Sequence, residues 1–312
     1  MNEVTAVLRA LVPVVLMMGL GYVLRRTRVF SDRGISELKF LVTKVILPAA
    51  IFHALATAEY TSRSWVLVGI MLVMMAVSFA LGYALRPAVE EPFRKYVPFM
   101  VSVYEGGMMA YPLYTFLCGM ENLSRIALLD IAGLIFGFSI YMSLLSFTES
   151  GDKPSAGKLA KDALTSPPFI AAVLGIAAGV RGVMRTFLST GAGEVYLAAE
   201  QMLTAPLSGI ILIVVGYSIQ MEKGMAGPCV KTVLLRAALQ AVMIISTLWA
   251  MRTFAGTDRL TETAAVIYMS APATFSMQSF VKDERGGHYV STANALYCFV
   301  SIAVFAAAAV LG

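Results

Sequence analysis

Charged residues are scarce in this sequence. Only 14% of its 312 residues are charged and 58% are hydrophobic, whereas an ordinary soluble domain has about 25% charged and about 45–50% apolar residues. Cysteine and histidine are scarcer still. The three cysteines and two histidines show neither the paired spacing of a disulfide framework nor the clustering of a zinc site. The sequence therefore indicates a chain whose main solvent is lipid.

Several functional patterns are also missing. The net charge is +5, but lysine and arginine stand in short clusters between apolar runs, so we expect no nucleic-acid partner. The phosphate-binding pattern GxxxxGK[ST] does not occur, which excludes ATP as a driving force within the chain. Neither HExxH nor a pair of aspartates occurs within an apolar run, so we expect no enzyme activity and no cofactor.

Long apolar runs dominate the chain instead. A helix that crosses a membrane needs about 20 mostly apolar residues. Ten runs qualify as transmembrane helices: 4–25, 36–57, 65–86, 96–118, 125–147, 165–183, 196–219, 230–254, 262–281 and 289–311. The odd-numbered loops between these spans hold fourteen Lys and Arg residues and the even-numbered loops hold six. Because basic residues stay on the cytoplasmic side, we expect a multi-pass protein of the cell membrane with both termini outside.

Prolines recur at similar places in the two halves of the chain. The pairs are Pro13 and Pro168, Pro48 and Pro206, and Pro112 and Pro272, and the separation within a pair is nearly constant. This spacing predicts two five-helix repeats, 1–147 and 165–312, joined by a cytoplasmic loop at 148–164. An odd number of spans inverts the second repeat, which is a plan typical of secondary transporters with sites near the membrane midplane.

Spans four and nine are the candidates for broken helices that cross. Span four contains YEGGMMAYP at 104–112, and span nine contains YMSAPATFSMQSF at 268–280. Unwound backbone persists at membrane depth only when it is buried in protein or lines a cavity. The positive N-terminal ends of broken helices would then suit an anion. The alternative is that these prolines and glycines mark ordinary kinks.

Ten residues around these breaks are candidates for substrate binding. They are Tyr104, Glu105, Gly106, Gly107, Pro112, Ser270, Pro272, Thr274, Gln278 and Asn294. For Asn294, which lies in span ten, hydrogen bonding between packed helices is the competing interpretation.

Three ionisable residues within the spans are candidates for ion coupling: Glu105, Lys44 and Asp130. A charge in a span is costly and is a functional hypothesis by default. Glu105 and Lys44 are expected to lie close together, either as a static ion pair or as a proton-coupled site. Asp130 is either a second coupling acid or cation ligand, or a helix-terminal acid that faces water. The coupling ion would be H⁺ or Na⁺.

Several motifs resemble the auxin efflux carrier family, the bacterial relatives of plant PIN-FORMED exporters. They are LVPVVLMMGLGYVLRRTRVF and FLVTKVILPAAIF in spans one and two, EGGMMAYPL in span four, ALLDIAG in span five, MSAPATFSMQSFVKDERGG in and after span nine, and VSTANAL in span ten. The resemblance implies ten helices in two inverted repeats with helices four and nine crossing. It also implies transport of small organic anions such as auxin, malate or malonate.

Two residues depart from this family's pattern. Glu105 and Lys44 stand where the family commonly has asparagine. An asparagine at the crossover could bind a carboxylate directly, whereas an ionised Glu105 would repel one, so the substrate cannot be transferred from the family.

The sequence thus predicts a secondary transporter that moves a small organic anion by alternating access, through rocking or elevator motion. A sodium-coupled carrier of the bile-acid type and a non-transporting membrane sensor are the alternatives. The direction of transport and the oligomeric state stay open, with a homodimer as one alternative.

Overall fold

The chain forms an all-helical membrane protein. The computed structural model describes residues 3–150, 156–219 and 225–311, and these residues form helices and turns but no strand. Among them, six helical segments are long and apolar enough to cross a membrane: Asp32–Thr57, Ser62–Ala88, Met120–Glu149, Gly191–Ser218, Ala226–Phe254 and Glu284–Val310. A shorter apolar helix is Pro167–Val180. The predicted helical class and the multi-pass topology are confirmed, whereas the number of ten spans stays a prediction.

The helices follow the predicted spans closely in position. In the first half of the chain they are α1 (Glu3–Arg26), α2 (Asp32–Leu41), α3 (Leu47–Thr57), α4 (Ser62–Leu85), α5 (Val97–Ser102), α6 (Tyr111–Cys118), α7 (Leu123–Phe136) and α8 (Met142–Ser150). In the second half they are α9 (Ala156–Leu164), α10 (Pro167–Val180), α11 (Val183–Leu188), α12 (Gly191–Thr204), α13 (Leu207–Ser218), α14 (Ala226–Phe254), α15 (Arg259–Met269) and α16 (Glu284–Leu311).

The segment 148–164, predicted as a loop, is helical throughout its described part. α8 runs to Ser150 and α9 occupies Ala156–Leu164, while 151–155 lies outside the described residues. The sequence AGKLAKDAL alternates apolar and charged residues at helical spacing, which favours an amphipathic helix over a loop.

Spans two and five each contain a short π-helical segment, as does the break in span four described below. Val42–Ile46 separates α2 from α3, and Gly137–Tyr141 separates α7 from α8. A π segment widens a helix by one residue in a turn and often occurs at functional sites. Lys44 lies in the first of these segments.

Spans four and nine are both broken, as the sequence predicts. α5 ends at Ser102, and the chain continues through a π segment at Gly106–Ala110 into α6. α15 ends at Met269, and a 3₁₀ segment follows at Phe275–Ser279. The two breaks are in direct contact, because the backbone N–H of Glu105 donates a hydrogen bond of 2.8 Å to the carbonyl of Pro272. We call the place where the two breaks meet the crossover.

The two halves of the chain pack against each other through helices with glycine at the contact. α1 packs along α13, and α10 packs along α3. A Cβ atom on Gly216 of α13 would overlap the carbonyl of Met18 in α1. On α10, a Cβ on Gly175 would lie 2.9 Å from the carbonyl oxygen of Phe52 in α3. Small residues allow membrane helices to approach this closely.

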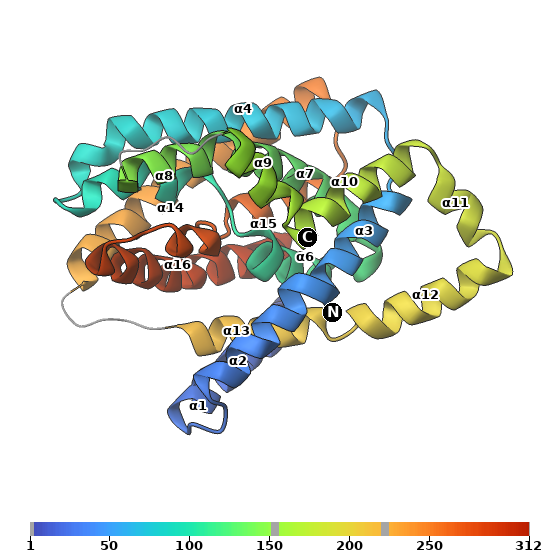
Figure 1. Ribbon diagram of the computed structural model, residues 1–312, viewed down its shortest axis with the longest axis horizontal. Coiled ribbons are helices and arrows are strands. Elements are labelled where there is room, and N and C mark those ends of the chain that lie inside the picture. Colours follow the sequence, from blue (N-terminus) through green and yellow to red (C-terminus); the bar gives the residue numbers. More distant parts are fainter. Residues whose placement is uncertain (1–2, 151–155, 220–224, 312) are drawn as a thin grey trace.

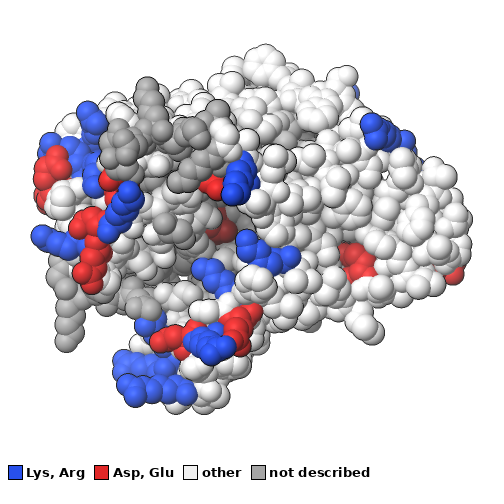
Figure 2. All heavy atoms as spheres, in the orientation of Figure 1, with Lys and Arg blue, Asp and Glu red and all other residues white. Residues whose placement is uncertain are grey.

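The outer surface is consistent with contact with lipid. In Figure 1, α4 runs along the upper edge of the molecule, and α11 and α12 form its right-hand end. Figure 2 shows that charged side chains gather at the left-hand end and along the lower edge of this face, while most of the right-hand part carries none. On α12, for example, Val195 and Met202 are 71% and 82% exposed.

The α1–α13 contact gives a testable prediction. Gly216→Ala should lower the thermal stability of the detergent-solubilised protein, because the added methyl group meets backbone atoms of Met18 and overpacking typically costs about 1–3 kcal/mol. Gly209→Ala, on the same helix, is the matched control, since a Cβ there meets no atom within 4 Å. Equal melting temperatures for the two variants would contradict this account of the contact.

Candidate functional site

The carboxylate of Glu105 lies where the two helix breaks meet. It accepts a hydrogen bond of 3.2 Å from the backbone N–H of Met108 and one of 2.6 Å from that of Phe275. These N–H groups belong to the first turns after the two breaks, where helix ends carry partial positive charge. The Thr274 hydroxyl lies 3.5 Å from the same carboxylate. One acidic side chain therefore caps both helix ends that the sequence analysis assigned to an anionic substrate.

The opposite ends of the breaks are held by Arg236 of α14. Its side chain is 1% exposed. The guanidinium donates hydrogen bonds to the carbonyls of Met100, Val103 and Ala271, the last at 2.7 Å. These carbonyls lie at the C-terminal ends of α5 and α15, which carry partial negative charge. Arg236 and Glu105 together neutralise the four helix ends created by the two breaks.

Aromatic and amide side chains enclose this arginine. The Arg236 guanidinium lies 5.6 Å from the ring centre of Tyr104 and 4.8 Å from that of Tyr297, within the range of cation–π attraction. The Tyr104 hydroxyl donates a hydrogen bond of 3.0 Å to Gln240, whose amide donates one of 2.6 Å to the carbonyl of Val101. Tyr104, a predicted binding residue, thus also supports the crossover.

Asp130 lies within α7 and connects three helices. The hydroxyl of Tyr111 in α6 donates a hydrogen bond of 2.7 Å to one carboxylate oxygen, and the hydroxyl of Tyr268 in α15 donates to the other. A Cβ on Gly106 would lie 2.6 Å from Asp130 Oδ2, so a larger residue at this position would displace the carboxylate. Asp130 is inside the helix bundle, unlike the water-facing helix-terminal acid of the alternative interpretation.

A cavity of about 470 Å³ opens beside the crossover. Its polar lining includes Glu105, Asp130, Lys39 and Lys44, and the backbone of Gly106 and Gly107 forms part of its wall. Lys44 and Glu105 therefore share one cavity, but no ion pair within 4 Å joins them among the described residues. The expected static pair is not formed.

The remaining candidates have different surroundings. Pro112 lies in the first turn of α6 and is buried, and a Cβ on Gly107 would lie 2.6 Å from a methyl carbon of Leu47. The Ser270 hydroxyl donates a hydrogen bond of 3.0 Å to its own helix, and the Pro272 carbonyl is bound by Glu105.

Thr274 lines the large cavity, whereas Gln278 and Asn294 line a separate, smaller cavity.

Four residues of the site were missed from sequence: Lys39, Arg236, Tyr111 and Tyr268. Lys39 lies in span two and Arg236 lies in span eight, so the rule that drew attention to Lys44 also applies to them. Tyr111 and Tyr268 lie in the two segments that the sequence predicts as helix breaks, but no sequence feature indicates that their hydroxyls meet Asp130.

An all-helical membrane protein with paired broken helices beside a charged cavity belongs to the class of multi-pass membrane transporters. The family model of the membrane transport proteins matches residues 6–309, and the chain belongs to that family. This confirms the resemblance to auxin efflux carriers. A search of curated proteins found no match.

The role of Arg236 gives a second prediction. Arg236→Lys should destabilise the protein by about 3 kcal/mol, because an ammonium group cannot reach all three carbonyls and each lost hydrogen bond to a charged group is worth about 1.5–3 kcal/mol. Thermal unfolding in detergent measures the effect. Arg252→Lys is the control on the same helix, since Arg252 is 64% exposed and pairs with Glu262 at the surface, where ion pairs contribute about 0–1 kcal/mol. If both variants unfold at the same temperature, Arg236 does not hold the crossover.

Proposed function

We propose that this protein is a secondary active transporter that moves a small organic anion, a carboxylate, by alternating access. The substrate binds in the large cavity beside the crossover of the two broken helices, next to Tyr104, Glu105, Gly106, Gly107 and Thr274. The observation that supports this most strongly is the pair of lysines in that cavity without an acidic partner.

The charges around the cavity favour an anion. Glu105 and Asp130 each accept hydrogen bonds from the protein itself, from backbone N–H groups and from two tyrosines respectively. Lys39 and Lys44 line the same cavity, and neither forms an ion pair within 4 Å among the described residues. A substrate carboxylate would supply the missing negative charge, and hydrogen bonds between ionised groups are stronger than neutral ones.

The packing of the helices supports two inverted repeats. If residues 1–147 correspond to 165–312, then α1 corresponds to α10 and the span of α3 corresponds to that of α13. The contact of α1 with α13 is then matched by the contact of α10 with α3. The contact of α4 with α7 is likewise matched by that of α14 with α16. Ten spans with both termini outside, and movement of one bundle against the other around the crossover, fit this symmetry.

Sodium coupling has less support than a proton or the membrane potential as driving force. In transporters with broken helices, free carbonyls at the helix C-termini can coordinate a sodium ion. Here Arg236 donates hydrogen bonds to those carbonyls and supplies the positive charge. The residues proposed to couple transport to an ion are Glu105, Lys44 and Asp130.

The test of the function is counterflow in proteoliposomes with a panel of small carboxylates. Lys39→Gln and Lys44→Gln should each raise KM about tenfold or more, because a hydrogen bond to a charged group is worth about 1.5–3 kcal/mol and about 1.4 kcal/mol is a factor of ten. Lys231→Gln is the control, since Lys231 is half-exposed and pairs with Glu90 at the surface. Binding of a carboxylate without any flux would contradict the transporter proposal and favour a non-transporting membrane sensor.

A separate measurement addresses the driving force. Flux should be unchanged when choline replaces sodium on both sides of the membrane, because Arg236 already binds the carbonyls that a sodium ion would need. Strict dependence on sodium would favour the sodium-coupled alternative. With a proton as the coupling ion, Glu105→Gln or Asp130→Asn should remove the pH dependence of flux. Unchanged pH dependence in both variants would leave the membrane potential as the driving force.

A further inference from the structure

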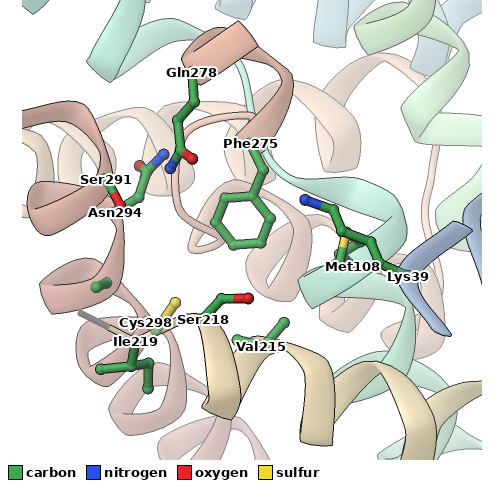
Figure 3. Close-up of a pocket in the computed structure, with 11 residues that line it drawn as sticks. Lys39, Met108, Val215, Ser218, Ile219, Phe275, Gln278, Ser291, Asn294 and Cys298 are labelled. Carbon is green, nitrogen blue, oxygen red and sulfur yellow. The ribbon is translucent and has the colours of Figure 1, made fainter. Parts of the chain in front are cut away.

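A second, smaller cavity lies between the crossover and the helices α13 and α16. Its volume is about 80 Å³, and Figure 3 shows the residues that line it. The polar residues that line it are Lys39, Ser218, Gln278, Ser291 and Asn294. Lys39, Met108 and Phe275 line both this cavity and the large one. Lys39 therefore borders two cavities that adjoin the same pair of helix breaks.

Asn294 is the unusual residue of this second cavity. It is 1% exposed, and neither its side-chain oxygen nor its nitrogen has a hydrogen-bond partner among the described residues. A buried amide is normally hydrogen-bonded, and each buried polar group without a partner is costly. Figure 3 shows the amides of Asn294 and Gln278 directed into the space beside the Phe275 ring. A ligand in that space would provide the missing hydrogen bonds.

The residues that line the small cavity favour a negatively charged ligand. Lys39 is the charged residue of the small cavity, and no acidic residue lines it among the described residues. The amides of Asn294 and Gln278 offer N–H donors, and the hydroxyl of Ser291 offers another. A cavity of this size holds one carboxylate group or a comparably small anion, and Lys39 disfavours a cation.

The proposed repeats relate the two cavities to each other. Both cavities are lined by the two broken spans; in addition, spans two, five and six line the large cavity, and spans seven and ten together with Lys39 of span two line the small one. Spans two and five are the counterparts of spans seven and ten under the repeat. The separation of Asn294 from Asp130 along the chain is close to that of Pro272 from Pro112. The position of Asn294 in the second repeat thus approximately corresponds to that of Asp130 in the first repeat.

We propose that the small cavity is a second carboxylate subsite, formed by the ammonium group of Lys39 and the amides of Gln278 and Asn294. This proposal rests on the proposed function, since exchange of the two repeats during alternating access would enlarge the small cavity and close the large one. The side chain of Lys39 borders both cavities, so it can keep its contact with the carboxylate while the wall formed by Met108 and Phe275 changes.

Cysteine labelling tests the subsite without requiring transport. Ser291→Cys is introduced into a variant in which Cys118, Cys229 and Cys298 are replaced by alanine. The detergent-solubilised protein reacts with an anionic and a cationic methanethiosulfonate reagent, and mass spectrometry gives both rates relative to free cysteine. The anionic reagent should react about fivefold faster than the cationic one, as expected for one nearby positive charge. Acetate, at constant ionic strength, should slow the labelling.

Further substitutions assign these effects to residues. Lys39→Gln should remove the preference for the anionic reagent. Asn294→Leu should remove protection by acetate, and Gln278→Leu provides the same test at a more exposed position if the first variant does not fold. Ser246→Ala is the control, because Ser246 lies in α14, lines neither cavity, and donates a hydrogen bond of 2.9 Å to the Val242 carbonyl of its own helix. This variant should keep both effects.

Two outcomes would overturn the subsite: equal rates for the two reagents, or labelling that acetate does not slow. Active counterflow combined with either outcome would remove the subsite and leave the proposed function intact. Protection by acetate in a protein without flux would support the subsite and contradict the proposed function.

Discussion

The neutralisation of four helix ends by one acid and one arginine is the constraint on which the rest of the structure depends. Breaking two membrane helices leaves backbone N–H groups and carbonyls that lipid cannot bind. Glu105 accepts from the N-terminal side of both breaks, and Arg236 donates to the carbonyls on the other side. With both charges provided by side chains, the crossover is held together by the chain itself.

This arrangement divides the charged residues into two groups. Glu105, Arg236 and Asp130 form hydrogen bonds with the backbone or with tyrosines of the protein itself. Lys39 and Lys44 border the cavity, and in the proposed function they bind the substrate carboxylate. An acid at the crossover, which would repel a carboxylate if it faced one alone, therefore does not prevent anion binding nearby.

The helix breaks could be predicted from the sequence, because glycine and proline within an apolar run have a direct physical effect on a helix. The importance of Glu105 could be predicted for the same kind of reason, since a charge in a span needs an explanation. The backbone groups that bind Glu105 could not be predicted from the sequence. Which backbone groups meet a side chain depends on how helices from opposite halves of the chain cross. The same rule applies to Lys39 and Arg236, which also lie within spans. Tyr111 and Tyr268 lie in the two predicted breaks, but their hydrogen bonds to Asp130 depend on how the helices pack.

The glycine contacts between α1 and α13 and between α3 and α10 have a consequence for biosynthesis. Each joins a helix from the first half of the chain to one from the second half. While the ribosome is still producing the second half, the faces of α1 and α3 that later pack on it have only lipid or other proteins as neighbours. Helices α1 and α3 therefore lie in the bilayer without these partners at first, and the native arrangement is reached only after α13 has emerged from the ribosome.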